Sequence, residues 1–285
     1  MTAYNFSLHT YPFSLAVTNQ SSALYHAIKQ LYPAEVFQPF DLQQFYDFDL
    51  NIKKRRRLLG AEFYVGSASE HFRMSEPAHL PAIFEWAFNW SVASFQHHYL
   101  SIHAAVLQKG AVTLVMPAAP GSGKSTLAAM LMLEGWRLLS DETCFIDTLS
   151  GAVLPSVRPI SLKNHSLQVI KQRYADAPVL FNITNTIKGT IGYLLPSELS
   201  WQQANQACRA THIIFPLYQA GAESTTFNRL TPSNSFMQLA INSFNYSVLG
   251  VEGFNALSQL VNSTQAFELI YADSDHALAL LDELI

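Results

Sequence analysis

The sequence predicts an α/β fold, and three observations in one stretch of the chain support this prediction. Residues 112–117 form a continuous apolar segment, which is typical of a strand in the interior of a sheet. A turn rich in glycine follows at 118–123. A helix-forming segment then runs from about residue 124 to Gly135, a residue type that commonly ends helices. A buried strand, a tight turn and a helix in succession are the building unit of α/β proteins.

Residues 1–95 are predicted to form a small N-terminal α+β region. The segments 13–19 (FSLAVTN) and 61–67 (AEFYVGS) alternate apolar and polar residues, as half-buried strands do. The segment 22–32 has apolar residues at helical spacing. A long, mostly buried helix is predicted after Pro81.

Residues 96–285 are predicted to form the larger α/β domain. The segment 99–108 (YLSIHAAVLQ) is expected to be one strand, with a turn at 109–110 before the strand 112–117. The remaining predicted elements are a strand at 136–142, a hairpin at 144–155, strands at 212–218 and 266–271, and helices within 232–250, 252–262 and 275–284.

Composition argues against several classes of partner. Only 13% of residues are charged and the formal net charge is −4, so the chain lacks the basic surplus that favours nucleic acid or anionic membranes. The apolar stretch 80–95 is too short to span a bilayer and contains Glu85 and Asn89. The N-terminus does not resemble a signal peptide, and two cysteines do not make a disulfide framework, so a cytoplasmic protein is expected.

The turn at 118–123 predicts a phosphate-binding loop, the Walker A motif G-x-x-x-x-G-K-[ST]. The sequence departs from this motif at Ala118, which stands in place of the first glycine, and Pro120 removes one backbone donor. Lys124 is expected to neutralise the β- and γ-phosphate oxygens, and the Ser125 hydroxyl to ligate Mg²⁺. The residues predicted to contact the nucleotide are Ala118, Gly121, Ser122, Gly123, Lys124, Ser125 and Thr126.

An acidic pair and a histidine accompany this loop. Asp141 ends the strand 136–142, 17 residues after Lys124, and is predicted to ligate Mg²⁺. Glu142 is expected to act as a general base or to support the metal from outside its coordination sphere. His103 lies 21 residues before Lys124; either it relays a proton near the γ-phosphate or it is a satisfied core residue.

Several segments together resemble one known family. They are IHAAVLQ, PGSGKST, EGWRLLSDE, VRPISLKN, IIFPLY, NSFNYSVLG and FELIYADSDHALALL, and they run from about residue 75 to the C-terminus with a weaker match before it. These segments are similar to the catalytic domain of HPr serine kinase/phosphorylases, and more closely to the group called HprK-related kinase A.

This resemblance implies a P-loop core of the HPr kinase/PEP-carboxykinase type with a mixed sheet. It implies an ATP-dependent kinase that uses Mg²⁺, in which His103 and Glu142 activate the acceptor hydroxyl and Asp141 contacts the metal. In HPr kinases the second acid is Asp, so Glu142 is one methylene longer. The resemblance also points to a peptide acceptor presented by a PqqD-like protein and to a homo-oligomeric ring. The glycine-rich signature of the bifunctional enzymes is absent, so phosphorylase activity is not implied.

Two further cationic segments are candidates for anion binding. Arg158, a predicted catalytic residue, suits a bidentate phosphate contact, and Lys163 nearby is either a second contact or an ordinary surface cation. The run KKRRR at 53–57 either docks an acidic partner or is a solvated strand edge.

Three functions remain open from the sequence. An ATP-dependent kinase acting on a peptide, protein or small-molecule hydroxyl is favoured. An ATP-switched binding module without efficient phosphotransfer is the main alternative, because of the departures at Ala118 and Glu142. A nucleoside monophosphate kinase ranks below both, since such enzymes usually carry the loop at the N-terminus and use several arginines in a lid.

Overall fold

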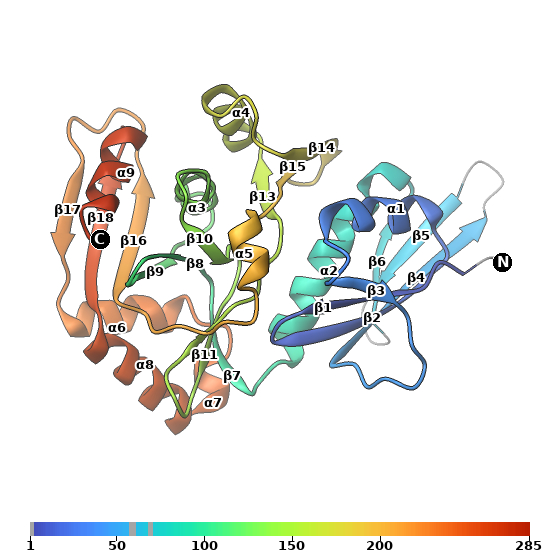
Figure 1. The fold of residues 1–285 in the computed structure, drawn as a ribbon, viewed down its shortest axis with the longest axis horizontal. Coiled ribbons are helices and arrows are strands. Elements are labelled where there is room, and N and C mark those ends of the chain that lie inside the picture. The colour runs from blue at the N-terminus through green and yellow to red at the C-terminus, as the bar shows by residue number, and fades with distance from the viewer. Residues whose placement is uncertain (1–2, 57–60, 68–70) are drawn as a thin grey trace.

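The structure, a computed structural model, describes residues 3–56, 61–67 and 71–285. The described residues form an α/β fold with mixed sheets and several helices (Figure 1). No helix within these ranges combines the length and the apolar character that crossing a membrane requires.

The N-terminal part of the chain builds a six-stranded sheet in the order β3-β1-β2-β4-β5-β6. Strands β2 and β4 are parallel, and the other neighbouring pairs are antiparallel. The helix α2 packs on this sheet through apolar side chains such as Phe84 and Phe88. The elements are β1 (Phe6–Thr10), β2 (Phe13–Asn19), α1 (Ser22–Leu31), β3 (Phe37–Pro39), β4 (Phe48–Arg56), β5 (Ala61–Gly66), β6 (His71–Met74), the short 3-10 helix η1 (Pro77–His79) and α2 (Leu80–Phe95).

The central sheet has six strands in the order β10-β8-β9-β16-β18-β17. Strands β9, β16 and β18 are parallel to one another, whereas β8, β10 and β17 run antiparallel to their neighbours. The sheet is therefore mixed, as expected. Its elements and those of the helices around it are β8 (Ala104–Lys109), β9 (Val112–Pro117), α3 (Lys124–Leu133), β10 (Arg137–Ser140), β16 (His212–Tyr218), β17 (Thr226–Arg229), α6 (Pro232–Ile241), α7 (Tyr246–Leu249), α8 (Val251–Ser263), β18 (Gln265–Tyr271) and α9 (Ser274–Asp282).

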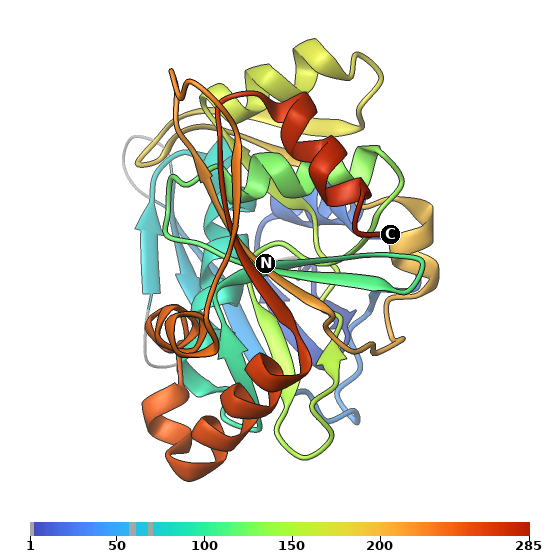
Figure 2. The ribbon, with the colours of Figure 1, turned by 90° about the vertical axis from the view of Figure 1, so that its left-hand side faces the viewer.

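Helices cover both faces of the central sheet, which explains why β8, β9 and β16 are buried over most of their length. Helices α3 and α9 pack on one face, and α6 and α8 pack on the other (Figures 1 and 2). A buried apolar cluster lies on each face of this sheet, and alternate residues of β8 point into the two clusters. Ala105 and Leu107 belong to the cluster on the α3 side, whereas Ala104 and Val106 belong to the cluster on the α8 side.

Two three-stranded sheets connect these parts, in the orders β12-β11-β7 and β13-β15-β14. The buried cluster under the N-terminal sheet extends into them through Phe145, Leu154, Ile183 and Tyr193, so the N-terminal core continues past residue 95. The elements are β7 (Tyr99–Ile102), β11 (Cys144–Asp147), β12 (Val153–Leu154), β13 (Ile160–Lys163), α4 (His165–Arg173), β14 (Val179–Thr186), β15 (Gly189–Leu194) and α5 (Glu198–Gln202).

The prediction of one strand over 99–108 is wrong, because the chain bends at His103. The part before the bend, β7, pairs with β11, and the part after it, β8, joins the central sheet. The backbone N–H of His103 donates to the carbonyl of Asn242 (2.8 Å) instead of to a strand partner. A contact with the distant link between α6 and α7 therefore divides the segment.

The predicted helix within 232–250 is also interrupted, at residues 242–245 between α6 and α7. Here the side chain of Asn245 accepts a hydrogen bond from the N–H of Ser101 (2.9 Å) and donates one to the carbonyl of Tyr99 (2.8 Å). Asn245 thus provides hydrogen-bond partners for the Ser101 N–H and the Tyr99 carbonyl at the edge of β7. A continuous helix would leave these backbone groups without these partners.

Candidate active site

The loop 118–123 joins β9 to α3 in a conformation that requires glycine. Gly121 and Gly123 have φ values of +88° and +89°, the left-handed region that other residues rarely adopt. A Cβ atom on Gly123 would lie 2.9 Å from the Cβ of Tyr218, whose backbone N–H donates to the carbonyl of Ser122 (2.8 Å). Among the described residues, no side chain caps α3, so the positive end of this helix is left for another acceptor.

Lys124 is the first residue of α3 and connects it to the end of β10. Its side chain is buried, and its Nζ atom donates a hydrogen bond to the backbone carbonyl of Asp141. The same nitrogen lies 3.8 Å from Oδ1 of Asp141. The end of β10 therefore lies beside the loop, as predicted, although β8 stands between β10 and β9 in the sheet.

Asp141 carries a buried carboxylate without a hydrogen-bond partner. The residue is 4% exposed, and neither of its oxygens accepts a hydrogen bond within the described residues. Burial raises the pKa of Asp141, Lys124 opposes this rise and Glu142 adds to it. Ser125 also lowers this pKa, although its hydroxyl makes no hydrogen bond of standard geometry with the carboxylate. A buried carboxylate without partners is costly, and a cation would satisfy it.

His103 and Glu142 face each other across the edge of this site. Nε2 of His103 lies 3.7 Å from Oε2 of Glu142, with side chains that are 23% and 40% exposed. Burial opposes ionisation of Glu142, but His103, Lys124 and Lys163 outweigh it and lower the pKa of Glu142. Glu142 is therefore ionised at neutral pH. The imidazole of His103 also lies beside the ring of Phe244, with 5.8 Å between the ring centroids.

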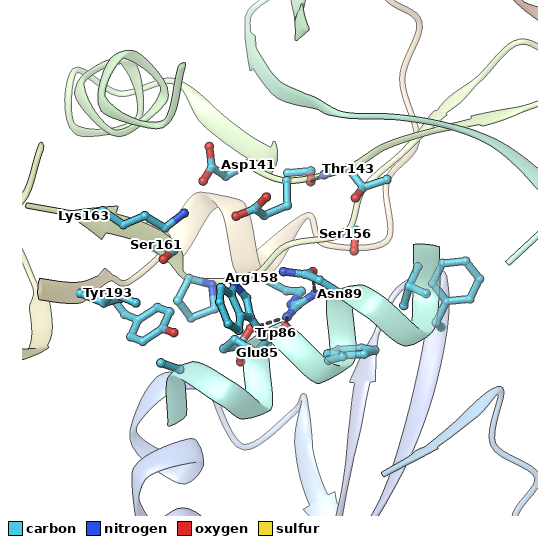
Figure 3. Close-up of a pocket in the computed structure, with 18 of the residues that line it drawn as sticks. Glu85, Trp86, Asn89, Asp141, Thr143, Ser156, Arg158, Ser161, Lys163 and Tyr193 are labelled. Carbon is cyan, nitrogen blue, oxygen red and sulfur yellow. Dashed lines mark hydrogen bonds and ion pairs between the residues drawn. The ribbon is translucent and has the colours of Figure 1, made fainter. Parts of the chain in front are cut away.

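A small cavity opens in front of the two carboxylates. Asp141 and Lys163 lie on one side of it, and Glu85 and Trp86 of α2 lie on the other (Figure 3). Within the described part of the chain, the Lys163 ammonium makes no hydrogen bond or ion pair, yet its charge lowers the pKa values of Asp141 and Glu142. Lys163 is thus a cation without a fixed partner on the wall of this cavity, which we call the carboxylate cavity.

Arg158 lines the same cavity, but its guanidinium is directed at α2. It pairs with the buried carboxylate of Glu85 and donates to Oδ1 of Asn89 (Figure 3). It also donates to the hydroxyl of Tyr32 (3.3 Å) and lies over the ring of Phe88, 4.3 Å from the centroid. In this structure its donors are used within the protein, so it links the N-terminal core to the cavity wall.

The remaining predicted nucleotide contacts lie in or next to the loop. Ala118 is buried directly after β9, Thr126 is partly buried in the first turn of α3, and the hydroxyl of Ser122 is buried without a partner. Within the residues that the structure describes, no group of three or more His, Cys, Asp or Glu is arranged to hold a metal ion by protein ligands alone.

Sequence reasoning missed the contribution of α2, which supplies Glu85, Trp86 and Asn89 to the cavity. The only available signal was polarity: Glu85 and Asn89 interrupt an otherwise apolar helix. The basic segment 53–56 lies on β4, with its side chains exposed. The last residue of the predicted run, Arg57, lies outside the described residues.

Comparison with known proteins assigns no relationship to this chain. No protein-family model matches it, and no curated protein matches it significantly. The arrangement of Lys124, Asp141, Glu142 and His103 is therefore interpreted from its own geometry.

Proposed function

We propose that the protein is an ATP-dependent kinase that transfers the γ-phosphate to a hydroxyl group, on a P-loop core of the HPr kinase/PEP-carboxykinase type. The observation that carries this proposal is the buried carboxylate of Asp141, which lacks a hydrogen-bond partner and lies 3.8 Å from Lys124 at the start of α3. Three groups therefore lie close together: a carboxylate, an ammonium and an uncapped helix N-terminus. The carboxylate suits the metal ion of a metal-bound polyphosphate, and the other two suit its phosphates.

The loop accounts for the phosphate contacts. Positive φ values at Gly121 and Gly123 turn successive peptide groups around the start of α3, where backbone N–H groups bind anions. On binding, Lys124 would exchange its contact with the Asp141 carbonyl for phosphate oxygens. This exchange requires only a rotation of its flexible side chain.

Ser125 and Asp141 fit a magnesium ion. In nucleotide sites Mg²⁺ is usually held by one or two protein ligands together with phosphates and water, so a cage of protein ligands is not needed. These two residues would hold the ion, whose positive charge would offset the negative charge that develops during transfer. Coordination would also relieve the cost of burying the Asp141 charge.

Glu142 and His103 supply the proton chemistry. Glu142 is ionised and partly exposed, so it can accept a proton from an acceptor hydroxyl that enters the carboxylate cavity. The acceptor oxygen then bonds to the γ-phosphorus as the bond to the leaving ADP breaks, and the proton ends on the Glu142–His103 pair. Lys163, on the cavity wall, is positioned to stabilise the transferred phosphoryl group.

Calorimetry with ATP and Mg²⁺ tests this proposal. The native chain should bind ATP with measurable heat, and Lys124→Ala should weaken binding at least about tenfold, since a charge-assisted contact is lost. Lys29→Ala, an exposed lysine on α1, is the matched control and should bind as the native chain does. Absence of binding in the native chain would overturn the proposal. Single-turnover reactions with labelled ATP then test transfer to an acceptor.

A further inference from the structure

A second cavity, of about 230 Å³, lies beside the carboxylate cavity. It is formed by α2, the end of β6 and the turn between β14 and β15. The two cavities share three wall residues, Ala82, Trp86 and Ile191. A molecule in the second cavity is therefore separated from the carboxylate cavity only by side chains that line both.

The surface of this second cavity is mainly apolar and includes one indole ring, although polar residues also line it. Ile83 and Trp86 come from α2, Met74 from β6, and Ile187 from the hairpin turn. Ile187 is 92% exposed, which is unusual for an isoleucine. An apolar wall of this kind favours a ligand with a flat or branched hydrocarbon body.

Lys188 provides a cation in this apolar setting. Its Nζ atom lies 4.0 Å from the centroid of the Trp86 ring, and among the described residues it makes no hydrogen bond or ion pair. Burial lowers the pKa of Lys188, Lys163 lowers it further, and Glu142 opposes them. Lys188 therefore lies within electrostatic reach of Lys163 and Glu142 of the carboxylate cavity.

Of the other charged groups of this lining, Arg73 is in an ion pair, and Glu76 faces an imidazole that carries a charge only when it is protonated. Arg73 lies 3.3 Å from the carboxylate of Glu62, and Glu76 lies 3.4 Å from Nε2 of His79. Lys188 is thus the cation of this lining whose ammonium has no hydrogen bond or ion pair among the described residues, and its partner would be an anion.

We propose that this second cavity binds the acceptor, a hydroxyl compound with an aromatic or branched apolar body and a carboxylate. The body would lie against Trp86 and Ile83, and the carboxylate would pair with Lys188. The hydroxyl would then extend past Trp86 toward Glu142. This proposal rests on the proposed kinase function for the role of the ligand, but not for its binding.

Binding of small probes tests the proposal without ATP. The indole N–H signal of Trp86 is followed in ¹⁵N-labelled protein during titration with 3-phenyllactate. Lactate, which lacks the ring, and 3-phenylpropane-1,2-diol, which lacks the carboxylate, are the matched controls. We expect phenyllactate to shift the Trp86 signal and to bind about tenfold or more tightly than either control.

Two variants locate the contact. Lys188→Gln should weaken phenyllactate binding about tenfold, and Lys188→Arg should retain most of the binding. Lys188 lies next to the exposed turn residue Ile187. Unchanged NMR signals from the rest of the protein would show that both variants fold. Equal binding of the diol, no shift of the Trp86 signal, or binding unaffected by Lys188→Gln would overturn the proposal. Because Lys124→Ala and ATP calorimetry report on the nucleotide site alone, the two proposals fail independently.

Discussion

The Nζ atom of Lys124 donates a hydrogen bond to the backbone carbonyl of Asp141 and lies 3.8 Å from the carboxylate of the same residue. One buried ammonium thus connects the start of α3 to the end of β10. Its charge partly compensates the Asp141 carboxylate, which accepts no hydrogen bond within the described chain. Four predictions follow from the groups around this contact.

Asp141→Asn should stabilise the protein without nucleotide at pH 7. Burial raises the pKa of Asp141, so between the ordinary carboxyl pKa and the raised value the folded chain binds more protons than the unfolded chain. The free energy of unfolding therefore falls as pH rises through this window, because ionisation of this buried group costs more in the folded chain than in the unfolded chain. Asn removes this cost, and each kcal/mol gained raises Tm by about 2–4 °C.

Thermal melts with and without ATP and Mg²⁺ check this prediction. Ligand should raise the Tm of the native chain and not that of Asp141→Asn. Asp176→Asn, at an exposed position, should change neither value. A variant that is less stable without ligand, or that keeps the full ligand-induced shift, would contradict the role given to Asp141.

Glu142→Gln should reduce the rate of phosphoryl transfer about 10²–10⁴-fold, because the amide cannot accept a proton. ATP affinity should change little, since Glu142 is not assigned a phosphate contact. The pKa of Glu142 is lowered, so the native rate should persist to a pH below the ordinary glutamate pKa. Rapid-quench measurements on labelled ATP provide the rates, with the exposed Glu252→Gln as control. Full ATP binding with no transfer in any variant would favour an ATP-switched binding module instead.

Gly123→Ala should destabilise the fold and abolish nucleotide binding. The left-handed φ of +89° costs about 1–2 kcal/mol for alanine, and the contact with the Tyr218 Cβ adds about 1–3 kcal/mol. Gly221→Ala separates the two costs, since Gly221 also has a positive φ (+80°) but no atom within 4 Å of an added Cβ. Denaturant unfolding should show the larger loss at 123; equal losses would mean that the loop moves to accept the methyl group.

Glu85→Ala should cost about 3–5 kcal/mol of stability, because it leaves the buried Arg158 guanidinium without its carboxylate partner. The double variant Glu85→Leu/Arg158→Met removes both charges and should be much less destabilised. If Arg158 acts by positioning the cavity wall, the double variant should retain ATP affinity within about threefold. A loss of ATP binding comparable to that of Lys124→Ala would instead show a direct phosphate contact by Arg158.

The sequence predicted the elements whose patterns are local. The strand β9 is buried along its whole length and β16 along most of it, because helices cover both faces of their sheet, and α3 ends near Gly135, whose φ is +90°. The neighbourhood of Lys124 and Asp141 was also predictable, since β9 and β10 both end at the same edge of the sheet.

The remainder depended on contacts between distant segments. The bend at His103 is produced by the carbonyl of Asn242, which lies far away in the sequence and leaves the apolar pattern of 99–108 unchanged. Similarly, Glu85 looked like an interruption of an apolar helix until Arg158 was found opposite it. The strand β14 mixes apolar and polar residues without regular alternation, and in β4 the alternation of residues 48–52 gives way to the exposed basic run 53–56.

The helix α2 has a consequence for how the chain can be divided. The helix α2 contributes Glu85, Trp86 and Asn89 to the carboxylate cavity. A fragment that begins at residue 96 would therefore lose one wall of that cavity and leave Arg158 without its partners on α2. Trimming the first third of the polypeptide would thus dismantle the cavity through which the proposed acceptor would reach Glu142.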